Sequence, residues 1–346
     1  MNKIQIVSWL LTRRCNLRCS YCAIVRDYDG KPKEYPDMKH YIKNEMSTDF
    51  VIRVLKKLKK HNPNHFNIFY GGEPLLRKDL PDIINFCNEN DINYTIITNN
   101  SEEVQPMMKR LFEKTEYIVG LTSSVDPLVI SDESDSDRVN KCVEGFHKLI
   151  EYRGIVKDLV AEITVDNRNV PYLYNLVDTL SNMGINSDIT FIDIAKNQYY
   201  DFSNVTDTKL LVPKTKEIEE LFQKIIDDKL DVHMAKVLLP KILDTLPSNL
   251  DCGLEKNVHN MSIDADGSVR LCLRIRGVKT PRIQADKCFR DSGQLTERYK
   301  GSIIIDKEKY CKGCNWTCMI MSELTDKDEE NTDDLVHKQR RQKVET

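Results

Sequence analysis

The chain lacks several features that would assign it to whole classes of protein. No run of about 18 apolar residues occurs among its 346 residues, and no basic segment followed by an apolar stretch and a small-residue cleavage site opens it. These absences argue against a membrane-spanning or secreted protein. The formal net charge is only −3, so the chain has no strong electrostatic attraction for nucleic acid or an anionic membrane. We therefore expect a cytoplasmic protein that binds neither.

Histidine is scarce and cysteine is not. The seven histidines form no H-E-x-x-H motif, and the residues between His61 and His65 include Asn-Pro-Asn, which indicates a turn rather than a shared helix face. A histidine-based metal site therefore has weak support. Eleven cysteines in a reducing cytosol favour metal or redox chemistry over a disulfide framework.

Strand and helix patterns alternate over the first two thirds of the chain. Helical spacing of apolar residues occurs at 50–58, 80–87 and 170–180. This alternation favours a parallel sheet with crossover helices, open or curled into a barrel, whose chemistry lies at the carboxyl ends of the strands. The expected strands are residues 4–10, 66–70, 94–98, 117–125, 159–165 and 188–194.

From about residue 200 the pattern changes. Helical spacing at 214–228 and 232–243 leads into a cysteine-rich part, where residues 261–264 and 268–271 flank Asp266-Gly267 and predict a β-hairpin. We infer a second, smaller domain there. The last stretch, 323–346, is almost all polar and charged, which indicates a solvated or disordered tail.

Three cysteines stand close together at Cys15, Cys19 and Cys22, within residues 13–22, which we name the cysteine loop. Three protein thiolates leave one coordination position open. A [4Fe-4S] cluster with one iron free to bind a small molecule fits this pattern, and a three-ligand zinc with an open water site is the competing interpretation. A zinc knuckle or buried thiols would be a purely structural alternative.

The spacing Cys-x3-Cys-x2-Cys after a first strand, with Tyr21 before the last cysteine, resembles the signature of the radical S-adenosylmethionine (SAM) superfamily. The resemblance implies a partial (β/α)6 TIM-like barrel over residues 1–200. It also implies that the open iron chelates the amino and carboxylate groups of SAM and that Tyr21 lies near the adenine.

A second motif agrees with the first. Gly71-Gly72-Glu73-Pro74 follows the second expected strand and resembles the superfamily motif whose backbone and Glu receive the methionine ammonium group. Glycine permits close backbone approach, and a carboxylate accepts hydrogen bonds from a cation. Ser124 and Asp126 resemble the segment that approaches the ribose or the methionyl carboxylate, and Arg138 would pair with that carboxylate. An ordinary turn, a helix cap and a surface arginine are the alternatives.

Other polar residues stand at or near strand ends, where they would face a reaction chamber or act as capping and core hydrogen-bonding groups. They are Asn99, Asn100, Glu162, Thr164 and Asp193.

The C-terminal cysteines form another group. The hairpin would bring Cys272 back towards Cys252, and Cys311, Cys314 and Cys318 follow. The group resembles the SPASM and twitch extensions, whose cysteines bind auxiliary [4Fe-4S] clusters, but a full SPASM extension has more cysteines after its Cys-x2-Cys. We expect one auxiliary cluster on Cys252, Cys272, Cys311 and Cys314, with a four-cysteine zinc ribbon as the alternative.

The remaining cysteines have less defined roles. Cys318 and Cys288 stay unassigned; either would replace a ligand, serve a second site or be a plain thiol, and Cys318 would alternatively return a hydrogen atom to the substrate. Cys87 and Cys142 occupy apolar helix positions and are expected in the core. The resulting domains are a core at 1–200, a helical connector at 201–244, a cysteine-rich α+β domain at 245–322 and the tail at 323–346.

The resemblance implies reductive cleavage of SAM to methionine and a 5′-deoxyadenosyl radical, which abstracts hydrogen from a substrate. An auxiliary cluster would assist oxidation or bind substrate, and flavodoxin or ferredoxin would donate the electron. The substrate would be a small molecule such as a sugar, cyclitol or nucleoside, or a peptide or protein side chain. The fourteen residues before Cys15 slightly favour a small substrate, or a peptide recognised by the catalytic domain or by a separate protein. The alternative function is a noncatalytic scaffold that binds an iron-sulfur cluster or zinc and uses the same fold for recognition.

Overall fold

The computed structural model describes residues 4–17, 45–125, 144–191, 215–232, 260–270 and 283–296, with residues 212 and 299. Short 3-10 helices are η3 (Pro74–Leu76), η4 (Glu102–Val104) and η6 (Ala285–Lys287). The strands and helices, in chain order, are β1 (Ile6–Thr12), α2 (Thr48–His61), β2 (Phe66–Gly71), α3 (Leu80–Glu89), β3 (Asn93–Thr98), α4 (Gln105–Lys114), β4 (Ile118–Val125), β5 (Val156–Val165), α6 (Val170–Asn182), β6 (Asn186–Phe191), α7 (Lys216–Asp227), β7 (Asn260–Ile263), β8 (Ser268–Arg270) and β9 (Ile283–Gln284).

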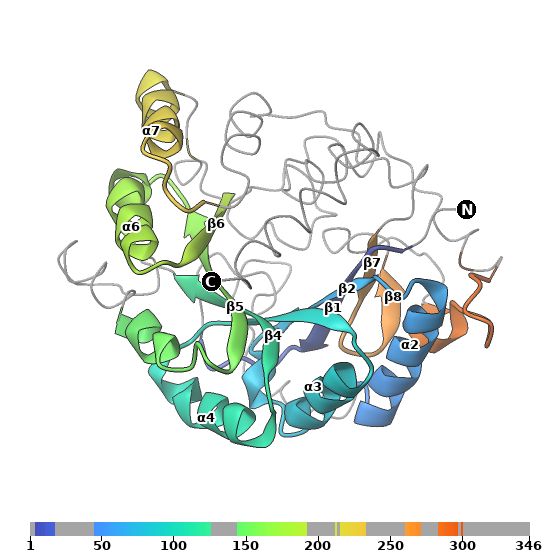
Figure 1. The fold of residues 1–346 in the computed structure, drawn as a ribbon. Helices are drawn as coiled ribbons and strands as arrows, with labels where there is room; N and C mark the ends of the chain where they lie inside the picture. The colour runs from blue at the N-terminus through green and yellow to red at the C-terminus, as the bar shows by residue number, and fades with distance from the viewer. Residues whose placement is uncertain are drawn as a thin grey trace.

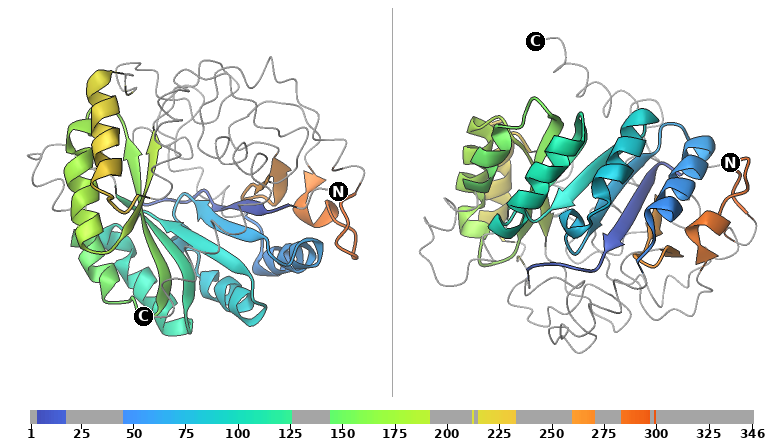
Figure 2. Two further views of the ribbon diagram at one scale, coloured as in Figure 1. Left: turned by 45° about the horizontal axis from the view of Figure 1, so that its top comes forward. Right: turned by 90° about the horizontal axis from the view of Figure 1, so that it is seen from below.

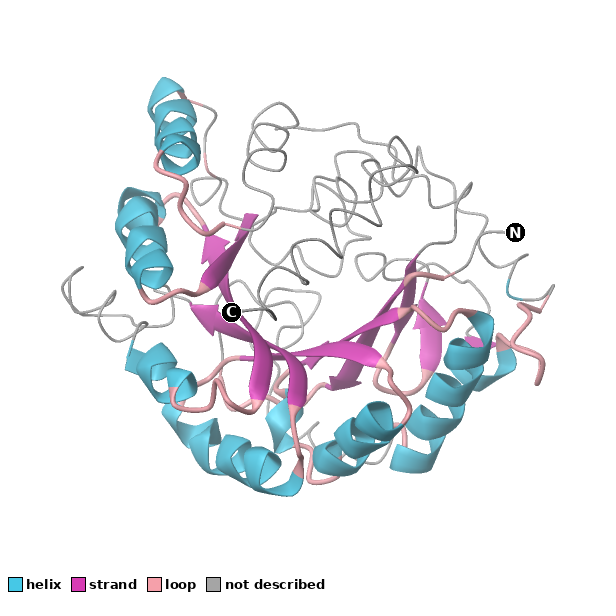
Figure 3. Ribbon diagram, viewed as in Figure 1, coloured by secondary structure: helices cyan, strands magenta, loops and turns pink. Residues whose placement is uncertain are grey.

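All described strands belong to one curved sheet with the order β6-β5-β4-β3-β2-β1-β7-β8-β9. Strands β1 to β6 are parallel neighbours in sequence order. The helices α2, α3, α4 and α6 follow the outer, convex side of this arc, as Figures 1 and 3 show, and the turned views of Figure 2 agree. The expected partial (β/α)6 barrel is confirmed.

The six expected strands all form, with shifted ends. The first runs over Ile6–Thr12 rather than 4–10, and the sixth over Asn186–Phe191, while residues 192–194 lie outside the described part. The expected helix at 214–228 contains α7, whereas residues 233–243 and the tail at 323–346 lie outside the described residues.

The outer face of the sheet buries a row of aromatic side chains under the helices. Trp9, Phe69 and Tyr94 come from β1, β2 and β3 and are fully buried, with ring centroids 6.1 Å and 5.9 Å apart along the row. The Trp9 indole N–H donates to Asn67 Oδ1 over 2.9 Å, so its one polar atom is satisfied. Large rings with satisfied polar groups make this side of the sheet a rigid base for the loops above it.

Helix α2 covers this base because its apolar residues recur every three or four positions. Val51, Val54, Leu55 and Leu58 are all fully buried. Ser47 caps the helix, since its hydroxyl accepts a hydrogen bond from Phe50 N–H over 3.2 Å. The start of the helix is therefore fixed at Ser47.

The predicted hairpin is confirmed as β7 and β8, which pair antiparallel. Its turn contains Gly267 at φ 78°, where a Cβ would lie 2.8 Å from the Phe50 ring, so both the backbone and the space require glycine. The sequence did not predict that β7 pairs parallel with β1, Ile6 opposite Asn260. The free edge of β1 needs backbone partners, and β7 supplies them.

Residues 283–296 pack against α2. Lys57 Nζ donates to the carbonyls of Asp286 and Phe289 over 3.0 Å and 3.2 Å. His61 accepts from Ile4 N–H at Nε2 over 3.1 Å, which leaves Nδ1 to donate to Gly293 O over 2.9 Å. The described C-terminal segments are thus fastened to the first strand and the first helix of the barrel.

No helix among the described residues is both long enough and apolar enough to cross a membrane.

His65, just before β2, generates a prediction on acid stability. The side chain is fully buried, with Nδ1 bonded to Asn62 O over 2.7 Å, and burial lowers its pKa to about 4. The unfolded chain binds a proton near pH 6.5 and the folded chain does not, so the stabilising contribution is complete above pH 6.5 and is lost as pH falls towards 4.

We expect the stability of the wild type relative to His65→Gln to fall by about 2 kcal/mol between pH 7 and pH 5. Urea denaturation of both proteins at the two pH values measures this difference. A difference that does not change with pH would contradict the prediction.

Candidate active site

The loops after β1 and β2 meet at the carboxyl edge of the sheet. Gly72 N–H donates to Thr12 O and Glu73 N–H donates to Arg14 O, each over 2.7 Å. A Cβ at Gly71 would lie 2.3 Å from Thr12 O, and one at Gly72 would lie 2.1 Å from Arg14 O. The two glycines are therefore required by the close approach of the backbone that leads into the cysteine loop.

Glu73 is fully buried and joins three loops. Its carboxylate accepts hydrogen bonds from Leu75 N–H (3.0 Å), the Thr98 hydroxyl (3.0 Å) and Asn99 N–H (2.8 Å). Burial raises the pKa of Glu73 to about 7, although all three donors favour the charged form. Glu73 also caps η3, which begins at the buried Pro74. The Glu73 carboxylate thus binds three groups of the chain itself, and its expected contact with a ligand ammonium group stays a prediction.

Cys15 lies three residues beyond β1 and is 8% exposed. Its Sγ accepts from Leu17 N–H over 3.4 Å and from Asn99 Nδ2 over 3.8 Å. Asn16 accepts from the same Asn99 amide over 2.9 Å and donates to Ser101 Oγ over 2.7 Å. Two donors directed at Sγ favour a thiolate, the form in which cysteine binds a metal, so Cys15 fits an iron-sulfur ligand.

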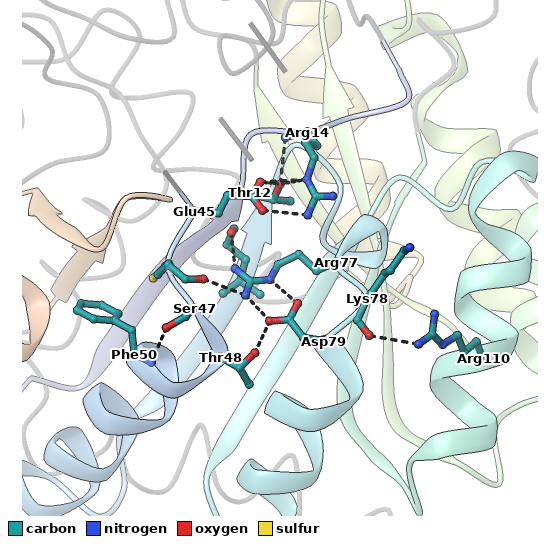
Figure 4. A network of polar contacts seen from close by, with 12 residues as sticks. Thr12, Arg14, Glu45, Ser47, Thr48, Phe50, Arg77, Lys78, Asp79 and Arg110 are labelled. Carbon is teal, nitrogen blue, oxygen red and sulfur yellow. Dashed lines mark hydrogen bonds and ion pairs between the residues drawn. The ribbon is translucent and has the colours of Figure 1, made fainter. Parts of the chain in front are cut away.

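Two adjacent arginines hold the start of the cysteine loop. Arg14 bonds to both carboxylate oxygens of Glu45, over 3.1 Å from Nε and 2.9 Å from Nη2, and Thr12 Oγ1 donates to the same carboxylate (Figure 4). Arg13 Nη2 bonds to both oxygens of Asp264, beyond β7, over 2.7 Å and 2.8 Å. Glu45 therefore binds the start of the cysteine loop through Arg14, and Asp264 joins it to the β7–β8 hairpin through Arg13.

A third arginine, Arg77, is buried against the end of β1. The Arg77 side chain is 3% exposed and donates to Leu11 O (2.9 Å) and to Met46 O (3.1 Å). It also donates to Asp79 from Nε (3.0 Å) and Nη2 (2.6 Å), as Figure 4 shows. Thr48 Oγ1 adds a hydrogen bond of 2.6 Å to Asp79. Burial acts to raise the pKa of Asp79, but the bonds from Arg77 and Thr48 outweigh it and lower the pKa.

The carboxyl half of β4 to β6 contributes a polar group. Glu162 lies opposite Ser124 on β4 and Asp188 on β6 in the strand register, and all three side chains are half-buried. Burial raises the pKa of Glu162 to about 7; the charge of Asp188 adds to the rise and a hydrogen bond with Thr190 opposes it. The pKa of Glu162 thus lies near neutral pH, beside the Asp188 side chain. Thr164 stands two residues further along β5 and is also half-buried.

Other expected positions have structural roles. Asn100 has a left-handed backbone at φ 50°, and its Oδ1 accepts a hydrogen bond from Nε2 of Gln105, the first residue of α4, over 2.6 Å. Cys87 is fully buried on α3, as predicted for a core residue, and burial raises the pKa of its thiol. Cys288 is fully buried in the same core, and its thiol bonds to Gln284 O over 3.6 Å.

Many expected site residues lie outside the described part of the chain: Cys19, Tyr21, Cys22, Asp126, Arg138, Cys142, Asp193, Cys252, Cys272, Cys311, Cys314 and Cys318. Within the described ranges, no three His, Cys, Asp or Glu side chains converge as a metal site. Cys15 stands near the motif at 71–74 and near Asn99, and Ser124 stands near Glu162.

Sequence reasoning missed the charged contacts around the cysteine loop. Arg13 and Arg14 directly precede Cys15, and that adjacency was the one local signal. Their partners Asp264 and Glu45 are 251 and 31 positions away, so no local pattern could pair them.

Known proteins resemble this chain in sequence and in fold. Residues 9–164 match the model of the Radical SAM superfamily. The Fe-coproporphyrin III synthase of Methanosarcina barkeri is 30% identical over 184 residues, which cover 51% of this chain and 42% of that protein. The PqqA peptide cyclase of Granulibacter bethesdensis is 25% identical over 217 residues, covering 60% and 51%. The chain thus spans about half the length, or less, of these two relatives.

Among solved structures, Streptococcus suis SuiB bound to S-adenosylmethionine has a similar fold. The TM-score is 0.56 at 15% identity, and the match covers 87% of this chain and 68% of that one. At this identity the likeness concerns the fold alone.

The Arg77 network generates a stability prediction. Arg77→Ala leaves Asp79 and the carbonyls of Leu11 and Met46 without their buried donor, so we expect a loss of about 3–5 kcal/mol in the free energy of unfolding. Arg110→Ala is the matched control, because Arg110 is exposed and makes one contact of 3.5 Å with Lys78 O; its effect should stay within about 0.5 kcal/mol. Guanidinium denaturation measures both. Equal effects of the two variants would refute the assignment.

A second prediction concerns Arg13 and Asp264, whose side chains are only 12% and 5% exposed. Arg13→Asp and Asp264→Arg alone each place like charges together, so each should lower the unfolding free energy clearly, and the double variant should recover at least half of the loss. The same exchange at the exposed pair Lys216 and Glu220 should change stability by less than about 0.5 kcal/mol. No recovery in the double variant would argue against a direct pair.

Proposed function

We propose, on the basis of the match between residues 9–164 and the model of the Radical SAM superfamily, that this chain is a radical SAM enzyme that reductively cleaves S-adenosylmethionine and uses the product radical to modify a substrate. Members of this superfamily are enzymes that bind a [4Fe-4S] cluster and SAM. When bound, the reduced cluster supplies one electron to SAM, which yields methionine and a 5′-deoxyadenosyl radical that abstracts hydrogen from the substrate.

One observation carries the proposal. The two motifs, separate in sequence, meet in space: Glu73 N–H donates to Arg14 O, the residue before Cys15. We assign Cys15, Cys19 and Cys22 to the cluster and the backbone of the motif at 71–74 to the methionine ammonium group. The Glu73 carboxylate stabilises that backbone through its three hydrogen bonds with Leu75, Thr98 and Asn99.

The rest of SAM would lie along the neighbouring strands. We assign Tyr21 to the adenine, Ser124 and Asp126 to the ribose or the methionyl carboxylate, and Arg138 to that carboxylate. The position of Ser124 at the carboxyl half of β4 supports this assignment.

The substrate would face the polar residues of β5 and β6. Glu162 and Asp188 can accept hydrogen bonds from a hydroxyl or an ammonium group, which a small molecule or a peptide side chain would offer. Relatives named as a porphyrin synthase and a peptide cyclase represent both classes. Asp193 would add another acidic group to the same substrate-facing residues.

We further propose an auxiliary [4Fe-4S] cluster on Cys252, Cys272, Cys311 and Cys314 in a domain at 245–322, with 201–244 as connector. Its roles would be to assist oxidation or bind substrate. The hairpin β7-β8 supports this, because it brings Arg270, two positions before Cys272, opposite Ser262. Cys318 would be a fifth ligand or a hydrogen donor to the substrate.

Superfamily enzymes need a reductant, and we propose flavodoxin or ferredoxin as the one-electron donor. A cytoplasmic location follows as a proposal from the clustered thiols, which a reducing compartment preserves.

The proposal predicts that reconstituted, reduced protein forms 5′-deoxyadenosine from SAM and holds about eight irons, four for each cluster. Replacing Cys15, Cys19 and Cys22 together by Ala should remove about four irons and reduce 5′-deoxyadenosine to background. Cys87→Ala is the matched control, since Cys87 is a core thiol on α3. Iron and sulfide analysis with chromatography of the products measures the outcome.

Persistent cleavage in the triple variant would disprove the site assignment. Zinc without cleavage in the wild type would instead favour the noncatalytic scaffold.

A further inference from the structure

The side chain of Asn99 reaches from the end of β3 to the sulfur of Cys15. Its Nδ2 lies 3.8 Å from Cys15 Sγ and 2.9 Å from Asn16 Oδ1. The amide carries two hydrogens, so it can serve both acceptors at once. Asn99 thereby contacts the first cysteine of the loop from a different strand.

The orientation of the Asn99 amide is fixed by its other contacts. The Asn99 Oδ1 accepts a hydrogen bond from Ser101 N–H over 3.0 Å, and the backbone N–H of Asn99 donates to Glu73 Oε2 over 2.8 Å. A flipped amide would turn its oxygen towards Asn16 Oδ1 and Cys15 Sγ, both acceptors here, and its nitrogen towards a donor. The hydrogen-bond network therefore requires the nitrogen to face the sulfur.

Hydrogen bonds to a cysteine sulfur influence an iron-sulfur cluster in a known direction. An N–H donor withdraws electron density from the thiolate and stabilises the more negative, reduced state. Leu17 N–H already donates to Cys15 Sγ from within the loop over 3.4 Å. Asn99 adds a donor that does not belong to the loop and that a single substitution can remove.

We propose that Asn99 is a positioning residue for the cluster: its amide holds the Cys15 sulfur and raises the reduction potential of the cluster. This inference rests on the proposed function, since it takes Cys15 to be a cluster ligand. The buried Glu73 carboxylate holds the Asn99 backbone, so the motif at 71–74 and the sulfur of Cys15 belong to one chain of hydrogen bonds.

The test is a potentiometric titration of the reconstituted protein, without SAM, followed by electron paramagnetic resonance of the reduced cluster. Asn99→Asp keeps the oxygen that accepts from Ser101 N–H and replaces the donor by a negative oxygen. Asn99→Ala removes the donor without adding charge. Both should shift the midpoint potential to more negative values, with the larger shift in Asn99→Asp.

At the wild-type midpoint we expect the ratio of reduced to oxidised cluster to fall about tenfold in Asn99→Asp, equivalent to about 59 mV for one electron. Asn85→Asp adds the same charge on α3, where the Asn85 side chain donates to Lys114 O over 3.0 Å, and should leave the potential unchanged. Ser101→Ala removes the contact with Asn16 but not the donor to sulfur, and controls for local loosening.

Wild-type potentials in both Asn99 variants, with normal iron content, would overturn the proposal. Iron loss in Asn99→Ala but not in Ser101→Ala, with both variants folded by circular dichroism, would support the proposal, because it would show that the cluster needs the Asn99 amide to hold the Cys15 sulfur. A wild type that binds no cluster would refute the proposed function and is recognised before any variant is compared.

Discussion

The arrangement of the site depends on one buried carboxylate. Glu73 accepts hydrogen bonds from its own loop and from two residues at the end of β3, while its backbone N–H reaches the loop after β1. Three parallel strands therefore end at one fixed point. A carboxylate with this many donors is costly to bury without them, so the three loops must adopt their positions together.

The two faces of the sheet carry different kinds of side chain. The helix side is filled by rings such as Trp9 and Phe69, which bury large areas and leave no polar atom unsatisfied. The opposite side of β4 to β6 carries Ser124, Glu162 and Asp188 at matching positions in the register. Stability thus comes mainly from one face and chemistry from the other, which allows polar residues to vary without disturbing the core.

Local signals account for what the sequence could predict. The six strands follow from apolar runs and alternation, the hairpin from Asp266-Gly267, and the core position of Cys87 from helical spacing. That Cys15 and the motif at 71–74 lie together was predictable because each follows a strand, and parallel strands bring their carboxyl ends together. Interactions between distant residues were not predictable. The bond from Asn99 to Cys15 spans 84 positions, and that of Arg13 to Asp264 spans 251.

The parallel pairing of β1 with β7 has a consequence for biosynthesis. Strand β1 leaves the ribosome well before its second neighbour, because Asn260 stands 254 positions after its partner Ile6. At about 5–20 residues per second, roughly 13 to 50 seconds separate the two. Throughout that interval β1 presents an open edge, and the nascent barrel is exposed to pairing with other chains. The order of translation therefore delays completion of this edge until β7 has been made.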